Sequence, residues 1–98
     1  MSIQYLANKD VQVLEEKGRT YGDSWKKRGG VGAFMMLARK WDRIENQCKE
    51  KNYDIFDAGH SSDTVDGILD DIADLRRYLL LVEDHIVSNP TYDNPPNQ

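Results

Sequence analysis

Residues 63–86 carry the feature that most constrains the fold, an unbroken apolar row with carboxylates along its margin. Steps of four and three residues separate its members, which are Ile68, Ile72, Leu75, Leu79, Val82 and Ile86. This spacing keeps one face of an α-helix buried. Asp71 and Asp74 lie three residues apart beside the row. Charges at the margin of a core are costly unless cations or hydrogen-bond donors compensate them.

A hard divalent ion is one candidate for that compensation. Mg²⁺ takes oxygen ligands and binds through one or two carboxylates together with substrate phosphates, so Asp71 and Asp74 are predicted metal ligands. The helix dipole offers a simpler explanation. The aspartates from Asp63 to Asp71 lie near a helix start, where negative charge is favoured.

Two shorter helices are expected before this one. Residues 2–17 have an imperfect apolar stripe, and Gly18 is placed to end it. Residues 31–51 place their apolar side chains on one helical face, so Phe34 and Trp41 are expected in the core.

The segments between and after these helices are expected to be irregular. Residues 19–32 contain four glycines and four basic residues and are predicted to form a loop. Residues 52–62 have no helical period, and Ser62 or Asp63 is the expected cap of the long helix. Gly67 inside that helix suggests close contact with another backbone or a ligand.

The chain is predicted to be one helical domain over residues 1–88, followed by a proline-rich tail over residues 89–98. No apolar run approaches the length of a membrane span, and the first residues do not have the pattern of a basic region followed by an apolar one, so we expect a cytoplasmic protein without membrane contact. One cysteine, Cys48, is expected to be a buried thiol.

The net charge of −4 hides an asymmetry, because residues 1–51 carry +4 and residues 52–98 carry −8. The halves could pack together, or the basic half could receive an anion such as a nucleotide phosphate. General nucleic-acid binding is disfavoured, because the basic residues form no stripe with interleaved aromatics.

The helix over residues 31–51 presents an acidic and a basic flank. Asp42 and Glu45 are three residues apart, and so are Lys40 and Arg43 on the other side of the apolar stripe. Only one flank can face Asp71 and Asp74 directly. The acidic flank would complete a metal cage, whereas the basic flank would form a structural salt-bridge cluster.

The glycine-containing loop offers ligand contacts of its own. Lys26 and Lys27 could hold phosphate oxygens while Tyr21 or Trp25 stacks on a base, although a solvated basic turn explains the same residues equally well. The two histidines, His60 and His85, belong to no metal-ligand spacing and are expected to be surface or capping residues.

Three segments together resemble the phage-associated nucleotide modification associated domain 1 family. They are Tyr21-Gly-Asp-Ser-Trp25, Lys40-Trp-Asp-Arg-Ile-Glu-Asn46 and Asp66-Gly-Ile-Leu-Asp-Asp-Ile-Ala-Asp-Leu75 with Tyr78 after it. The last helix is also similar to the closing helix of MazG-like all-α nucleoside triphosphate pyrophosphohydrolases.

The resemblance implies a helical, oligomeric protein that uses Mg²⁺ to cut nucleoside triphosphates. The MazG-like Glu-x-x-Asp pair then corresponds to Asp71 and Asp74 as metal ligands. The first Glu-x-x-Glu pair of those enzymes falls near Lys40 and Arg43, and carboxylates follow only two residues later. Without carboxylates at positions 40 and 43, half of the metal site would be missing, which would leave a domain that binds a nucleotide without hydrolysing it.

We therefore expect an all-α fold of three main helices, a small bundle completed by homo-oligomerisation. The leading hypothesis is a phage-type, MazG-like nucleotide-binding protein in the host cytoplasm, with Mg²⁺-dependent pyrophosphohydrolysis of nucleoside triphosphates as its candidate activity. Its assigned residues are Asp71 and Asp74 for Mg²⁺, Asp42 and Glu45 for catalysis, and Tyr21, Trp25, Lys26, Lys27, Lys40 and Arg43 for the nucleotide. The alternatives are a non-enzymatic protein that sequesters a nucleotide signal or binds a host protein, and a purely structural adaptor.

Overall fold

The computed structural model describes residues 2–61 and 65–89, and every regular element in this part of the chain is helical. In chain order these are α1 (Ile3–Tyr21), the short 3-10 helix η1 (Ser24–Lys26), α2 (Gly29–Lys49), α3 (Ile55–His60) and α4 (Val65–Ser88). The expected all-α fold with three main helices is confirmed. None of the described helices combines the length and the apolar character that crossing a membrane requires.

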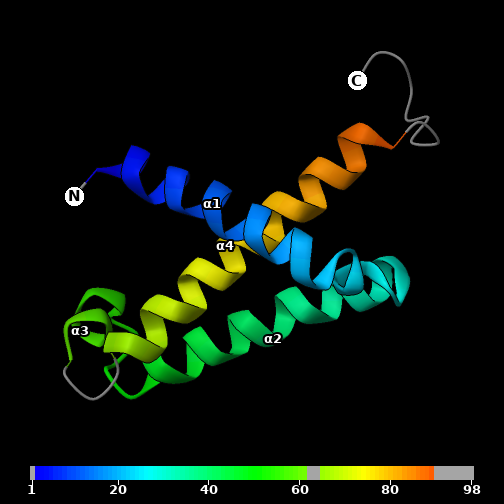
Figure 1. Cartoon of the computed structure of the whole chain (residues 1–98). Coiled ribbons are helices and arrows are strands. Elements are labelled where there is room, and N and C mark those ends of the chain that lie inside the picture. Colours follow the sequence, from blue (N-terminus) through cyan, green and yellow to red (C-terminus); the bar gives the residue numbers. More distant parts are fainter. Residues whose placement is uncertain (1, 62–64, 90–98) are drawn as a thin grey trace, which may run out of the picture.

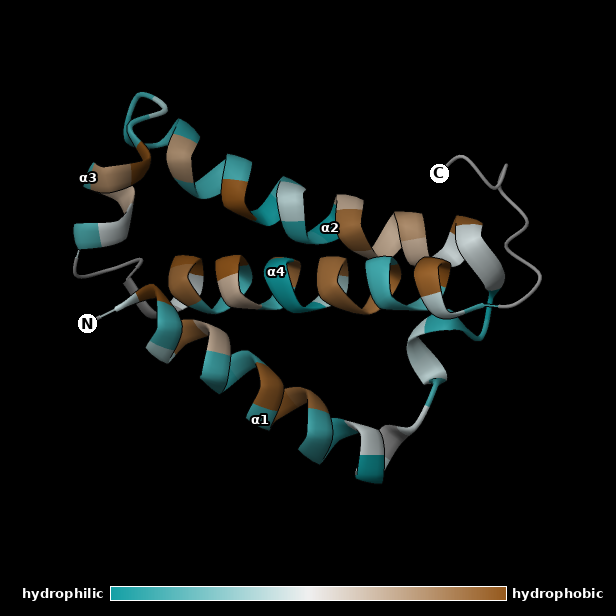
Figure 2. Cartoon of the chain, turned by 90° about the horizontal axis from the view of Figure 1, so that it is seen from above, coloured by the Kyte–Doolittle hydropathy of each residue, from teal (hydrophilic) through white to brown (hydrophobic). Residues whose placement is uncertain are grey.

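Helix α4 is the centre of the arrangement. It runs antiparallel to α2 (Figure 1), and Figure 2 shows it lying between α2 and α1. The contacts between α2 and α4 are the most extensive, whereas α1 touches α4 over a short stretch. The long apolar row recognised in the sequence therefore belongs to the helix that most of the fold packs against.

The predicted loop over residues 19–32 is mostly helical. Helix α1 continues through Gly18 and ends only where Gly22 takes a positive φ of 61° and its N–H donates to the Gly18 carbonyl at 3.1 Å. Helix α2 begins at Gly29. A single glycine inside a helix costs only about 1 kcal/mol, so Gly18 did not end α1.

Helix α3 was not predicted, because six residues are too few to show a helical period. The Asp54 carboxylate caps it by accepting from the Asp57 N–H at 3.0 Å. Its Ala58 is fully buried and joins the core. The expected caps Ser62 and Asp63 and residues 90–98 of the expected tail lie outside the described residues.

The core is small and lies at one end of the molecule. It consists of Ile44, Cys48, Ala58 and Ile68, with Ile72 and Leu75 packed against it. Cys48 is buried, as expected. A Cβ atom at Gly67 would lie 3.1 Å from the Gln47 Oε1 atom, so the close neighbour of this glycine is a side chain of α2 and not the backbone or ligand that the sequence suggested.

The prediction that Phe34 and Trp41 are core residues is wrong for the single chain. Their side chains are 64% and 53% exposed. The apolar side of α2 is wider than the surface that α3 and α4 cover. Ile44 and Cys48 face these helices, whereas Phe34 and Trp41 lie further around α2 and remain at the surface.

A buried ionic contact fixes α1 to α4. Asp10 is almost fully buried, and its carboxylate accepts from the guanidinium groups of two consecutive arginines, Arg76 and Arg77. Arg76 binds both carboxylate oxygens, with an Nη2–Oδ1 distance of 2.8 Å, and the Arg77 Nε atom lies 2.7 Å from Oδ1. The hydrogen bond from Arg76 lowers the pKa of Asp10, and Arg77 reinforces the effect against the opposing effect of burial.

Replacing Asp10 should therefore detach α1. We expect Asp10→Asn to lower the free energy of unfolding by about 2 kcal/mol near neutral pH, because two guanidinium groups lose their anion. Chemical denaturation followed by circular dichroism measures the change. Glu15→Gln removes the same charge from an exposed position of α1 and serves as the control.

The pH dependence supplies a second readout of the same contact. Because the pKa of Asp10 is lower in the folded state, its ionised carboxylate stabilises the fold fully above the ordinary pKa of 3.8. This stabilisation is lost as the pH falls through the pKa that Asp10 has in the folded protein. The stability difference between wild type and Asp10→Asn should therefore shrink on acidification. A difference that stays constant down to strongly acidic pH would contradict this assignment.

Candidate functional site

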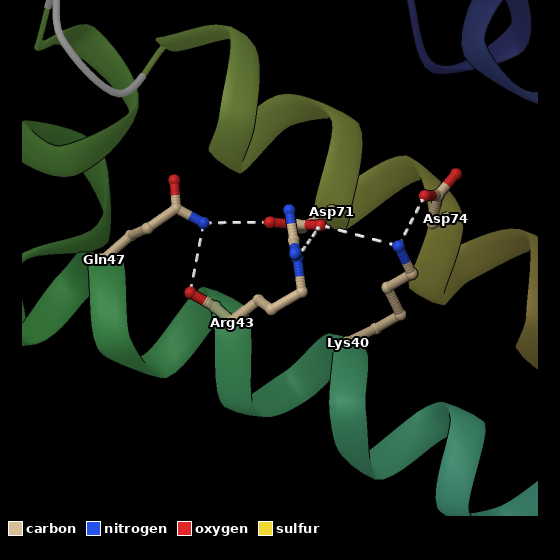
Figure 3. A network of polar contacts seen from close by, with 5 residues as sticks. All are labelled: Lys40, Arg43, Gln47, Asp71 and Asp74. Carbon is tan, nitrogen blue, oxygen red and sulfur yellow. Dashed lines mark hydrogen bonds and ion pairs between the residues drawn. The ribbon is translucent and has the colours of Figure 1, made fainter.

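An ionic network joins the C-terminal half of α2 to the N-terminal half of α4 (Figure 3). Asp71 is its buried centre. Its Oδ1 atom accepts from Arg43 Nε at 2.8 Å and lies 3.7 Å from Lys40 Nζ, and its Oδ2 atom accepts from Gln47 Nε2 at 2.9 Å. Lys40 Nζ also lies 2.9 Å from an oxygen of Asp74. The basic flank of α2 thus faces α4, and the salt-bridge arrangement is confirmed.

The carboxylates in this network do not fit a divalent cation. Both oxygens of Asp71 are already bound by donors from α2, and two cations balance the two carboxylates of Asp71 and Asp74. An ion placed between them would meet an ammonium and a guanidinium group at close range. Within residues 2–61 and 65–89, no three His, Cys, Asp or Glu side chains are placed to hold a metal ion.

The predicted catalytic residues lie away from this network. Asp42 and Glu45 are both exposed on α2. Helical geometry separates them from Lys40 and Arg43, so turning the basic flank to α4 turns the acidic flank outwards. Asp42 and Glu45 therefore do not join Asp71 and Asp74, and their catalytic role stays a prediction without support from the geometry.

A hollow lies between the C-terminal half of α1, η1 and α4. We call it the α1–α4 hollow, and its volume is about 320 Å³. It is lined by Leu14, Lys17, Gly18, Gly22, Ser24, Trp25, Asp74, Arg77, Tyr78 and Leu81. This volume lies at the lower end of the range found for small-molecule sites, about 300–1,000 Å³.

The groups around the α1–α4 hollow are chemically mixed. Trp25 and Tyr78 provide aromatic surface, Lys17 and Arg77 provide positive charge, and Asp74 provides a hydrogen-bond acceptor whose position Lys40 fixes. The Arg77 Nε atom is bound to Asp10, and its guanidinium carries further N–H donors. Such a site suits a planar, anionic ligand.

Glycines leave room at one wall of this hollow. Gly18 lies on α1, and a Cβ atom at this position would meet no neighbouring atom within 4 Å. Gly22 follows at the end of the helix and also lines the hollow. A larger side chain at Gly18 could extend into the hollow without clashing at its Cβ.

The residues predicted to bind the nucleotide separate into different places. Trp25 lines the α1–α4 hollow, whereas Lys40 and Arg43 belong to the ionic network. Lys27 is exposed, and the side chain of Tyr21 lies outside the described part of the structure.

Lys26 contacts the end of α4 instead. Its Nζ atom lies 3.3 Å from the Nδ1 atom of His85 and 5.8 Å from the centre of the Trp25 ring. The ring of Trp25 packs edge-on against that of His85, with 6.0 Å between their centres. His85 therefore helps to hold η1 on α4, while His60 is exposed as expected.

Three residues of the α1–α4 hollow were missed from the sequence. Lys17 and Arg77 belong to no recognised motif in their helices, and only tertiary packing brings them to Trp25. Tyr78 could have been singled out from the sequence, because it follows the third segment of the family resemblance. No family model, curated protein or solved structure matches this chain in the comparisons.

The network around Asp71 should contribute strongly to stability. We expect Asp71→Ala to lower the free energy of unfolding by about 2 kcal/mol, because Arg43 and Gln47 lose their buried acceptor and Lys40 keeps only Asp74. Asp70→Ala removes a carboxylate from the exposed neighbouring position and should change stability by less than about 1 kcal/mol. Equal effects of the two substitutions would contradict the structural role of Asp71.

Magnesium should not bind tightly at this network. We expect the thermal midpoint in millimolar MgCl₂ to equal that in NaCl of matched ionic strength, because no pair of carboxylate oxygens is left for the ion. Differential scanning fluorimetry measures both midpoints. A rise specific to Mg²⁺ that Asp71→Ala abolishes would restore the metal-site hypothesis.

Proposed function

We propose that this protein binds a nucleotide in the α1–α4 hollow and does not hydrolyse it through metal at Asp71 and Asp74. The observation that carries the proposal is the meeting of Trp25 and Tyr78 with Lys17 and Arg77 around a hollow of about 320 Å³. Aromatic rings favour a flat base, and the two cations favour its phosphates.

The family resemblance independently supports a nucleotide as the ligand. The Tyr-Gly-Asp-Ser-Trp segment ends at Trp25, and the third segment includes Asp74 and leads to Tyr78. Trp25, Asp74 and Tyr78 come from distant parts of the chain, and all three line the same hollow. The resemblance rests on the sequence alone, so the meeting of its residues at the hollow favours a binding role for this site.

The geometry favours binding over hydrolysis. In the metal-dependent mechanism expected from the resemblance, Asp71 and Asp74 hold Mg²⁺, but here Arg43, Gln47 and Lys40 occupy their oxygens. We therefore favour the alternative of a protein that holds a nucleotide or nucleotide signal. A factor directed only at a host protein has no specific support from this hollow.

The proposal predicts saturable nucleotide binding that depends on the hollow. Isothermal titration calorimetry with nucleoside mono- and triphosphates should give binding without Mg²⁺. Lys17→Ala should weaken it about tenfold, because a charge-assisted contact to phosphate is lost. Lys9→Ala removes the same charge from an exposed site on α1 that does not line the hollow, and should leave affinity unchanged.

A steric variant tests the location of the site independently of charge. Gly18→Leu should abolish binding by filling the hollow, while circular dichroism should show an intact fold because a Cβ there meets no neighbour. Release of pyrophosphate from a nucleoside triphosphate is assayed in parallel with Mg²⁺. Absence of binding by every nucleotide tested would refute the proposal, and pyrophosphate release by wild type would refute its non-hydrolytic part.

A further inference from the structure

The wall of the α1–α4 hollow that η1 provides depends on one histidine of α4. The Lys26 Nζ atom lies 3.3 Å from His85 Nδ1, and the Trp25 ring packs edge-on against the His85 ring. Helix η1 has only three residues, none of them buried, and the side chain of its N-cap Asp23 makes no capping hydrogen bond. So short a helix has little stability of its own. Its position, and that of Trp25 in the hollow, therefore depends on the contact with His85.

The direction of the hydrogen bond defines the state of the His85 ring. A lysine ammonium can only donate, so the Nδ1 atom of His85 accepts from Lys26, and the ring is the neutral tautomer with its hydrogen on Nε2. Protonation of Nδ1 removes the acceptor and places an imidazolium beside an ammonium group. Histidine is the side chain that ordinarily changes its charge between about pH 5 and pH 8. The contact that holds η1 is therefore sensitive to mild acid.

The other charged groups near His85 do not cancel this repulsion. Asp23 lies 3.8 Å from the Lys26 Nζ atom and is exposed, so it pairs with the lysine at the surface. Asp84 shares a hollow of about 400 Å³ with His85, but consecutive side chains of a helix do not face each other. Lys17 of α1, in the adjoining α1–α4 hollow, adds only positive charge. The residues of α2 that share a hollow with His85 are uncharged, namely Gly29, Gly30, Ala33, Phe34 and Leu37.

We infer that His85 is a positioning residue for the proposed nucleotide site, and that its protonation weakens binding by releasing Trp25 and η1 from α4. The inference rests on the proposed function, because Trp25 supplies part of the aromatic surface for the base. His85 does not itself line the α1–α4 hollow, so it acts on the ligand through Trp25. The site holds its nucleotide in neutral solution and loses affinity on mild acidification.

Calorimetric titration of the full chain with a nucleoside monophosphate at about pH 8 and about pH 5.5 tests the pH dependence. The phosphate of the ligand also changes its charge near about pH 6, but it does so for every variant. His85→Asn places an amide oxygen where it can accept from Lys26 and does not titrate. On acidification wild type should therefore lose about tenfold more affinity than His85→Asn.

The second histidine of the chain provides a matched control. His60 is exposed on α3, and His60→Asn makes the same substitution away from the site. This variant should keep the pH dependence of wild type. An equal loss of affinity in wild type and His85→Asn would overturn the inference, and so would a His60→Asn variant that loses the pH dependence.

The accessibility of Trp25 distinguishes a failure of this inference from a failure of the proposed function. The chain has two tryptophans, so quenching of Trp25 by acrylamide is followed without nucleotide in a Trp41→Phe background. Quenching should increase on acidification, and adding His85→Asn should remove the increase. His85→Lys keeps a positive charge beside Lys26 and should leave Trp25 accessible at both pH values, while circular dichroism shows that the main helices are intact.

The two sets of measurements fail in different ways. Absence of nucleotide binding at both pH values would refute the proposed function, whatever the quenching shows. Nucleotide binding together with quenching that is independent of pH, or that rises equally in His85→Asn, would leave the proposed function standing and overturn the role of His85.

Discussion

The buried carboxylate of Asp71 is the interaction on which the arrangement of α2 and α4 depends. A negative charge beside Ile68 and Ile72 cannot be left without partners, since burial removes its hydration. The nearest compensating groups are the cations and the amide on one flank of α2. Satisfying Asp71 therefore sets the rotation of α2 about its axis and its position along α4. The same rotation turns Asp42 and Glu45 to solvent, so this electrostatic requirement also decides what chemistry the helix pair can offer.

The contact between α1 and α4 follows the same rule. Asp10 is buried between two arginines of α4, and α1 touches α4 only over a short stretch. Buried ion pairs often add less stability than apolar residues of similar size, but their partners fix one geometry because a mismatched charge is costly. Here they position the helices, while apolar burial is concentrated near α3. A fold held in this way has well-placed helices and a small core, and it leaves large apolar side chains such as Phe34 and Trp41 exposed.

The α1–α4 hollow is a consequence of these two ionic contacts. Asp10 holds α1 close to α4 through Arg77, and Lys40 holds Asp74, so two walls of the hollow are fixed by charges that also support the fold. The remaining wall comes from η1, which Trp25 and Lys26 attach to His85 near the end of α4. The proposed ligand site is thus assembled from three segments that are distant in sequence. This explains why its basic residues formed no recognisable motif.

The sequence by itself determined the helical class, the central helix and the position of acids at its margin, because a row such as Ile68, Ile72 and Leu75 records which face is buried. It also marked Trp25 and Tyr78 through the family resemblance. It could not decide between Lys40 with Arg43 and Asp42 with Glu45, since both pairs border the same stripe and only the packed helices show which one meets Asp71. It likewise could not find the partners of Asp10, which lie more than sixty residues away. Periodicity reports the burial of a face, whereas the choice of partner across that face depends on distances that exist only after the helices pack.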